Sequence, residues 1–311
     1  EILTMAKKSI TLNEKSKRTL QRKEDFSGYM FLLPALLLFG LFTFFPFIYS
    51  FILSLSEKIP GGTMSQVKLS GITQYTKLFS DKDFWNSLTV SCIYTFPVVF
   101  FHVFFGLLLS IGLNMKIPAR SALRAIYFMP YVISMVVCAM IWRFMYSANI
   151  GLFNVFISMF GFPRNIGWLT DPRYAMLGII ILSIWKYVGY HTVIYLAALQ
   201  DIPNSLYESA DIDGANAWQK FTRITFPLLS NTTWFLIIIS IINTFQAFDQ
   251  VYLLTQGGPL KKTDVIVYYI YRQAFQNFNM PYASAASWVL FVIVFILTAI
   301  QMKVSKRDWD Y

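Results

Sequence analysis

Six long blocks of apolar residues without a formal charge constrain this chain more than any other feature. They cover Phe26–Ser56, Phe84–Met115, Ala125–Trp142, Tyr174–Gln200 (interrupted once, by Lys186), Ile224–Phe248 and Gln273–Met302. A membrane-spanning helix needs roughly 20 predominantly apolar residues, and the shortest block, Ala125–Trp142, is close to that length. Only 14% of the residues are charged, against about 25% in soluble domains. The sequence therefore predicts an all-α integral membrane protein with six transmembrane helices.

The predicted organisation is one membrane domain between two polar tails. Residues 1–27 are a basic N-terminal tail, residues 28–303 the six-helix domain, and residues 304–311 a C-terminal tail. A cytoplasmic loop is expected at about 200–227, between the fourth and fifth spans. From the apolar blocks, the spans are expected at about 29–55, 86–113, 123–145, 174–199, 228–253 and 282–302.

The basic residues predict the orientation. With both termini inside, the inner segments hold 15 Lys and Arg residues and the outer segments hold 10. Lys and Arg accumulate on the cytoplasmic side of membrane proteins. We therefore expect a multi-pass membrane protein with both termini in the cytoplasm. The basic residues that set this orientation also account for the net charge of +10, so no nucleic-acid partner is expected.

The predicted loop at 200–227 has the pattern of two short helices that meet at a glycine. Ser205 and Glu208 have the spacing of a capping box, which would start the first helix. Gly214 can adopt the left-handed conformation that ends a helix. A second helix is expected over about 215–223, and Pro227 suits the first turn of the fifth span. Such a helix pair can dock into a groove of another protein or rest on lipid, and the spacing alone leaves both open.

This loop resembles the EAA loop of binding-protein-dependent ABC importer permeases, in which Glu-Ala-Ala is followed by three residues, Gly, nine residues and Ile-x-Leu-Pro. Here the same spacing joins Glu208-Ser209-Ala210, Gly214 and Ile224-Thr225-Phe226-Pro227, with Ser209 and Phe226 as mild departures. The resemblance extends from Gly28 to about Lys303, and its subfamily is the maltose and glycerol-phosphate type. Other matching stretches are Phe31–Ala35, Trp168–Pro172, Phe248–Tyr252 and Leu254–Pro259.

The resemblance implies a type I ABC importer permease fold, a place in a bacterial or archaeal cytoplasmic membrane, and a defined set of partners. These are a second homologous permease, two copies of an ABC ATPase, an extracytoplasmic solute-binding protein, the lipid bilayer and a carbohydrate substrate. ATP and Mg²⁺ would bind to the ATPase, and this chain would bind no cofactor. The loop would couple the permease to the ATPase through Glu208, Ser209, Ala210, Asp213, Gly214, Ala215, Phe221, Ile224 and Pro227.

Polar and aromatic side chains within the fourth and fifth spans are candidates for a substrate pathway. Polar residues at membrane depth usually line a pathway, although they can also form an interfacial belt or bond between helices. Lys186 and Asp249 could form an ion pair or contact a charged sugar. Together with the positions that bind sugar in the resembled family, the candidates are Ser183, Tyr187, Tyr190, Asn243, Phe245, Gln246 and Asp249.

No arrangement of residues in the sequence suggests catalysis. The chain has no Gly-x-x-x-x-Gly-Lys-Ser/Thr loop for ATP phosphates, and no Ser/His/Asp, Cys/His or paired-carboxylate set. Cys92 and Cys138 lie in apolar blocks and suggest no metal site, and His102 is interpreted as a packing histidine. An ATP-driven importer permease for a mono- or oligosaccharide, including an acidic one, is the favoured function. The alternatives are a permease for a glycerophosphate or polyol, a secondary transporter or channel, and a membrane-bound enzyme.

Overall fold

A computed structural model describes residues 28–58, 67–115, 118–161 and 163–305 of the chain. The predicted tail 1–27 lies outside the described residues, as does the C-terminal tail from residue 306. The first helix, Gly28–Ser54, contains a π-helical turn at Gly40–Phe44 and ends as α2. The elements are α2 (Phe45–Ser54), β1 (Ser56–Lys58), β2 (Val67–Leu69), α3 (Thr73–Ser80), α4 (Lys82–Asn114), α5 (Arg120–Val132), α6 (Met135–Met145), α7 (Leu152–Ser158), α8 (Ala175–Gln200), α9 (Asn204–Ile212), α10 (Ala217–Lys220), α11 (Phe226–Leu228), α12 (Ser230–Phe245), α13 (Asp249–Leu254), α14 (Ile266–Tyr271) and α15 (Met280–Ser305).

Four helices are long and apolar enough to cross a membrane, and two broken pairs bring the number of candidate spans to six. The third candidate span is α5 and α6, which meet at 97°. The fifth is a helix over Ala217–Leu228, bent by 58° from α12. Two spans expected as single helices therefore contain breaks, and the fifth begins inside the predicted loop. The short antiparallel pair β1–β2, in which Ser56 faces Leu69, is an addition that the sequence did not predict.

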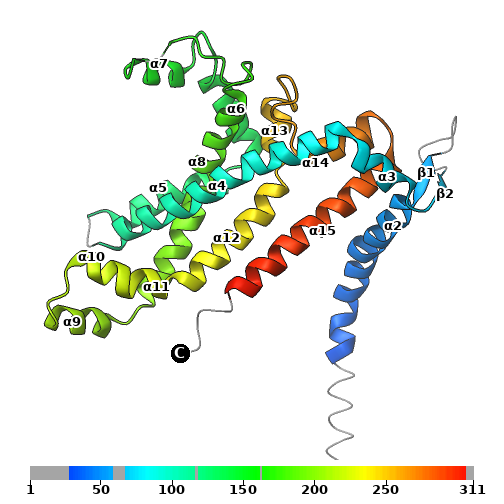
Figure 1. The fold of residues 1–311 in the computed structure, drawn as a ribbon. Helices are drawn as coiled ribbons and strands as arrows, with labels where there is room; N and C mark the ends of the chain where they lie inside the picture. Colours follow the sequence, from blue (N-terminus) through cyan, green and yellow to red (C-terminus); the bar gives the residue numbers. More distant parts are fainter. Residues whose placement is uncertain (1–27, 59–66, 116–117, 162, 306–311) are drawn as a thin grey trace, which may run out of the picture.

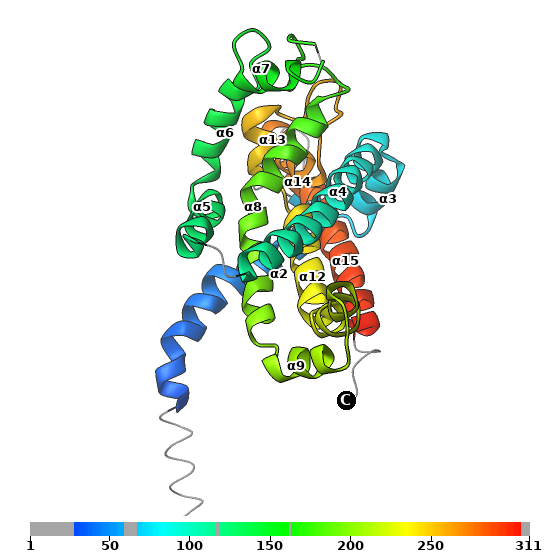
Figure 2. The same cartoon turned by 90° about the vertical axis from the view of Figure 1, so that its left-hand side faces the viewer.

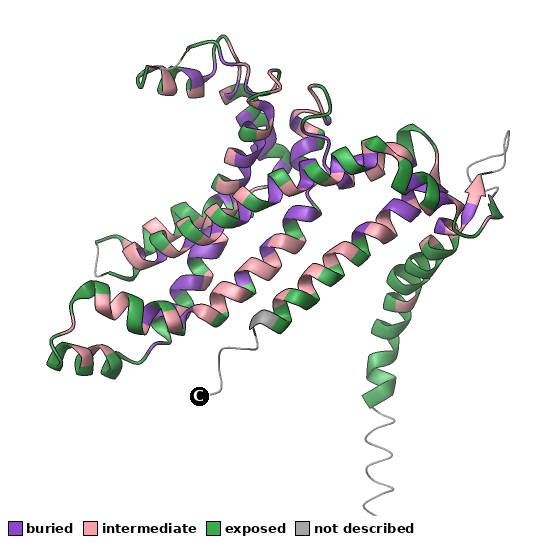
Figure 3. Ribbon diagram, viewed as in Figure 1, coloured by how far each residue is buried: buried purple, intermediate pink, exposed green. Residues whose placement is uncertain are grey.

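The first helix stands apart from the other helices, and only its α2 end contacts the body (Figures 1 and 2). Phe47 and Phe51 pack against Trp288 of α15, with ring centroids 4.6 and 4.9 Å apart. Trp288 also donates a hydrogen bond from its indole nitrogen to the Ser50 hydroxyl, at 3.2 Å. Most of this helix is exposed in the isolated chain (Figure 3). So apolar a surface must face lipid or another subunit.

The centre of the molecule is the close packing of α8 against α4 and α5. Two glycines permit it, because a Cβ at Gly106 would lie 2.6 Å from the Cβ of His191, and a Cβ at Gly189 would lie 2.0 Å from the carbonyl oxygen of Tyr127. Membrane helices commonly use small residues where their backbones approach closely. These two contacts fix the positions of α4, α5 and α8 around the cavity described below.

At one end of the molecule, Asp81 joins the start of α4 to α14 and α15. Its carboxylate accepts hydrogen bonds from the hydroxyls of Tyr269 (2.7 Å) and Tyr282 (2.6 Å). Burial raises the pKa of Asp81, but hydrogen bonds from the two tyrosine hydroxyls and from the backbone N–H groups of Asp83 and Phe84 together hold the pKa below its ordinary value. The same end carries α3 and α7, whereas the Gly28 end of the first helix, the end of α15 and α9 lie at the opposite end (Figure 1).

Candidate functional site

The first candidate site is the elbow, which we define as residues 201–229 with α9, α10 and α11. Helix α9 ends in a Schellman motif: the Gly214 N–H donates to the Asp211 carbonyl (3.1 Å) and the Ala215 N–H to the Ala210 carbonyl (2.9 Å). Gly214 has φ +75°, which confirms the predicted left-handed turn. Helix α10 then begins with a capping box between Asn216 and Gln219. The chain thus reverses within a few residues of Gly214.

The capping box predicted at Ser205 and Glu208 is wrong. Helix α9 begins at Asn204 after Pro203, without a side-chain cap, so Ser205 already lies within the helix. The second helix also differs from the prediction, because α10 continues through a π-helical turn at Phe221–Thr225 into α11. Pro227 lies in the first turn of α11. Continuous helix therefore connects the turn to Leu228, at the break before α12.

Two side-chain contacts across the elbow make it a braced unit. The Lys220 ammonium pairs with the Asp211 carboxylate at 2.6 Å, and the hydroxyls of Tyr207 and Thr225 lie 2.9 Å apart. Tyr207 and Ile224 also pack against a buried cluster that contains Leu229. Packed side chains therefore join α9 to the ends of α8 and α12 that lie at the elbow.

The outer surface of the elbow is exposed and mixes acidic with apolar side chains. Ile212 is 87% exposed and Trp218 is 70% exposed. Of the predicted coupling residues, Glu208, Ser209, Asp213 and Gly214 are exposed, and the others are partly buried beneath them: Ala210, Ala215, Phe221, Ile224 and Pro227. Large exposed apolar side chains beside carboxylates are typical of a surface that binds another protein.

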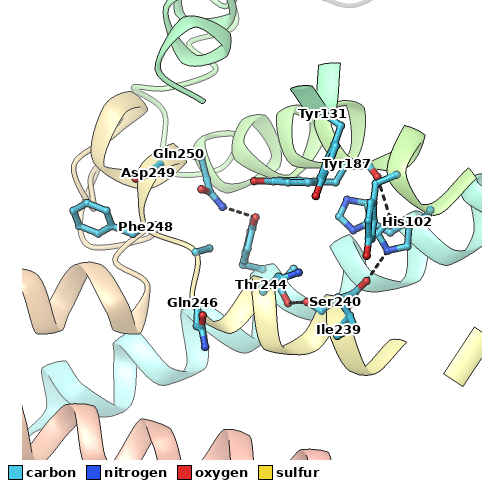
Figure 4. Close-up of a pocket in the computed structure, with 15 residues that line it drawn as sticks. His102, Tyr131, Tyr187, Ile239, Ser240, Thr244, Gln246, Phe248, Asp249 and Gln250 are labelled. Carbon is cyan, nitrogen blue, oxygen red and sulfur yellow. Dashed lines mark hydrogen bonds between the residues drawn. The ribbon is translucent and has the colours of Figure 1, made fainter. Parts of the chain in front are cut away.

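The second candidate site is a cavity of about 430 Å³ between α4, α5, α8, α12 and α13 (Figure 4). A cavity of this size suits a small ligand. It lies beside the break between α5 and α6 and beside the end of α12 that precedes α13. Five of the predicted pathway residues line it: Tyr187, Tyr190, Asn243, Gln246 and Asp249.

Two predicted pathway residues do not line the cavity. Ser183 is fully buried, and its hydroxyl donates to the Ile179 carbonyl (2.8 Å) and accepts from Tyr94 (2.8 Å). Phe245 is 4% exposed and packs in the cluster with Phe84 and Tyr269. The prediction assumed that the helix continues past Phe245. Helix α12 ends at Phe245, so Phe245 has no helical spacing to Gln246 and Asp249.

Several lining residues lie outside the predicted set. They are Tyr94, His102, Tyr131, His191, Ser240 and Gln250, among others. Tyr94 connects three helices, since its hydroxyl donates to Ser183 and accepts from the Gln250 amide at 2.8 Å. A polar residue inside an apolar block was the available signal, and it applied to His102 and His191 as well as to the residues selected.

The two histidines lie against each other in the cavity wall, with ring centroids 4.7 Å apart. His191 Nδ1 lies 3.0 Å from the Tyr187 carbonyl and His102 Nε2 lies 3.1 Å from the Ser183 carbonyl. A carbonyl can only accept, so each of these nitrogens carries a proton. His191 Nε2 then accepts from the Ser240 hydroxyl at 2.6 Å. In the described structure His102 Nδ1 has no hydrogen-bond partner.

Lys186 is buried behind Tyr187 at the break between α5 and α6. Its ammonium donates to the carbonyls of Pro130 (3.1 Å) and Ile133 (2.6 Å) and lies 4.0 Å from the Cys138 sulfur. These carbonyls are free because α5 ends there. The described ion pairs do not include one between Lys186 and Asp249. Lys186 therefore closes a helix end instead of pairing with Asp249.

Lys186→Met is expected to lower the stability of the protein by about 1–3 kcal/mol, because the two carbonyls lose their donor inside the bundle. Thermal unfolding of the purified protein measures this. Lys262→Met is the control, since Lys262 is exposed and its replacement should change stability by no more than about 0.5 kcal/mol. Equal midpoints for both variants would contradict the assigned role of Lys186.

The cavity offers hydrogen bonding and aromatic surface, and its wall carries little charge. Asp249 is the only Asp, Glu, Lys or Arg among the described lining residues. Elsewhere in the described segments, no group of three or more His, Cys, Asp or Glu could hold a metal ion. The described wall can offer hydrogen bonds and aromatic contacts to a polar solute.

Comparisons with known proteins identify the family of this chain. Residues 102–307 match the family of binding-protein-dependent transport system inner membrane components. The chain is 34% identical to a probable ABC transporter permease of Pyrococcus horikoshii (91% of this chain, 94% of the relative) and 34% identical to the lactose transport system permease LacF of Rhizobium radiobacter (94% and 98%). The fold matches a chain in the crystal structure of a bacterial ABC transporter that imports the acidic polysaccharide alginate. The TM-score is 0.81 at 28% identity, covering 93% of this chain and 98% of that one. The chain belongs to the binding-protein-dependent ABC importer permeases, with their helical type I fold, and is a membrane component of a transporter.

Proposed function

We propose that this chain is one of two permease subunits in an ATP-driven importer that moves a saccharide into the cell. One observation carries the proposal. An exposed elbow, held by side-chain contacts, is connected to the spans that surround a polar cavity. The names of the relatives support a carbohydrate, because one imports lactose and another alginate.

The remaining subunits would supply what this chain lacks. Two ABC ATPases would bind ATP and Mg²⁺ and dock on the elbow, a second permease would complete the cavity, and an extracytoplasmic solute-binding protein would deliver the saccharide. The elbow, the Gly28 end of the first helix and the end of α15 lie at the same end of the molecule (Figure 1). That arrangement supports the orientation with both termini in the cytoplasm.

Uptake by proteoliposomes tests the proposal. The complete importer, loaded with ATP on the ATPase side, is supplied with a panel of radiolabelled mono- and disaccharides and their uronic acids. We expect uptake of at least one of them, dependent on ATP and on all subunits. Uptake that follows an ion gradient without ATP would instead identify a secondary transporter.

A further inference from the structure

Helix α7 has an apolar face that the rest of the described chain leaves uncovered. The helix extends sideways from the end of α6, at the end of the molecule opposite the elbow (Figure 1). Its exposed large side chains are Leu152, Val155, Phe156 and Met159, and Met159 is 76% exposed. Their spacing of three, one and three residues places them on one side of a helix. We call these four residues the α7 face.

The opposite side of α7 is fixed to the protein by a buried asparagine and a phenylalanine. Asn154 is 2% exposed. Its amide nitrogen donates to the Ile166 carbonyl at 3.0 Å, and its amide oxygen accepts from the Trp168 indole N–H at 2.8 Å. The ring of Phe153 packs edge-on against those of Trp168 and Tyr146, with centroids 4.9 and 5.4 Å apart. These contacts determine which side of α7 points outward.

The segment around α7 has the composition of a membrane segment rather than of an aqueous loop. Residues 144–163 include no Asp, Glu, Lys or Arg. The polar side chains within α7 are Asn154, which is buried, and Ser158, whose hydroxyl donates to the Val155 carbonyl at 2.7 Å. A helix that is apolar on both sides belongs in apolar surroundings. A surface that docks a soluble protein normally has a polar rim.

The neighbours of this segment indicate that lipid covers the α7 face. Helix α6, which leads into it, belongs to a candidate span and also exposes large apolar side chains, among them Met140 and Phe144. Arg143 and Arg164 bracket the uncharged stretch, and both are exposed. Neither takes part in a described ion pair. Cationic side chains at both ends of an apolar segment complement the negative phosphate groups of a lipid surface.

We propose that α7 lies in the membrane interface at the end opposite the elbow, with the α7 face among the acyl chains and the two bracketing arginines at the phosphate groups. Such an anchor suits the third span. Helix α6 has 11 residues, which makes it about 16 Å long, about half of the hydrocarbon thickness, and it meets α5 at 97°. An interfacial helix would keep the end of this bent span at the membrane surface. The inference goes beyond the proposed function and does not depend on which solute is carried.

Spin-label accessibility tests this placement in the permease–ATPase complex in nanodiscs, without the solute-binding protein. Cys92 and Cys138 are replaced by alanine, and a nitroxide is attached to Phe156→Cys or Met159→Cys. Leu260→Cys is the control, because Leu260 is 81% exposed at the same end of the molecule. Oxygen concentrates in lipid and a nickel chelate in water. We expect labels on the α7 face to collide faster with oxygen than with the chelate, and the label at position 260 to show the reverse.

Two other outcomes would overturn the proposal. Faster collision with the nickel chelate at positions 156 and 159 would place the α7 face in water. Slow collision with both reagents would show that protein, such as the second permease, covers the face. The measurement requires no uptake, so an importer that carried no saccharide would refute the proposed function and leave this inference standing.

Discussion

Replacing Gly214 with valine is expected to reduce ATP-dependent uptake at least roughly tenfold. Gly214 has φ +75° with open space around its Cβ position, so the cost comes from the backbone and not from a clash. A β-branched residue in that conformation costs about 1–3 kcal/mol, and the turn relieves the strain by leaving the left-handed region. The Schellman bonds to Asp211 and Ala210 are then lost, and α9 no longer has a fixed direction relative to α10.

Gly71→Val is the matched control for this effect. Gly71 also has positive φ (+65°) and nothing within 4 Å of its Cβ position, but it lies before α3 at the other end of the molecule. Both variants should therefore lose similar stability, and only Gly214→Val should lose uptake while the complex still assembles and hydrolyses ATP. Equal uptake by the two variants would show that the direction of the elbow does not matter for transport.

Gly189→Ala should destabilise the protein by about 2–3 kcal/mol, seen as a lower midpoint of thermal unfolding. The added Cβ would lie 2.0 Å from the carbonyl oxygen of Tyr127 and 3.1 Å from the Cα of Phe128. Both are backbone atoms of α5, so the clash is relieved only by moving the helix, and overpacking of this kind costs 1–3 kcal/mol or more. Movement of α5 also displaces Tyr131 from the cavity, so solute binding should weaken as well.

Gly112→Ala provides the comparison within the same bundle. Gly112 is a helical residue of α4 with nothing within 4 Å of its Cβ position. Alanine is the better helix former by about 1 kcal/mol, so this variant should be as stable as the wild type or more so. A Gly189→Ala midpoint at or above that of Gly112→Ala would contradict the close packing of α5 on α8.

The sequence was sufficient for the parts of the fold that depend on local composition. Apolar blocks predicted six spans because length and lack of charge decide what can cross a membrane. Gly214 was identified as a turn because a glycine that follows a helical stretch readily adopts the left-handed conformation that ends a helix. The resemblance of the same loop pointed to the family, which the comparisons confirm.

The breaks within spans could not be predicted in this way. Pro130 lies inside α5, yet the chain breaks after it, at Ile133 and Ser134. The carbonyls freed there are satisfied by Lys186, more than 50 residues along the chain. An interaction between distant segments leaves no local pattern in the sequence, and the same break bends the span by 97°.

Only part of the cavity could be predicted, because it also depends on contacts between distant segments. Tyr187 and Tyr190 share one face of a regular helix, so spacing placed both correctly, whereas the end of α12 removed Phe245 from the expected face. His102 and His191 come together because Gly106 lets α4 approach α8. The sequence does not show whether either histidine packs in the core or lines a cavity, because that depends on how α4 and α8 lie against each other.

Photo-crosslinking from the elbow tests the central claim most directly. A photoreactive amino acid replaces either Ile212, which is 87% exposed on the elbow, or Leu260, which is 81% exposed in the segment between α13 and α14, at the opposite end. In membranes that contain the complete importer, we predict a covalent product with the ATPase from position 212 and none from position 260. No ATPase product from position 212 in an intact, ATP-hydrolysing complex would contradict coupling through the elbow.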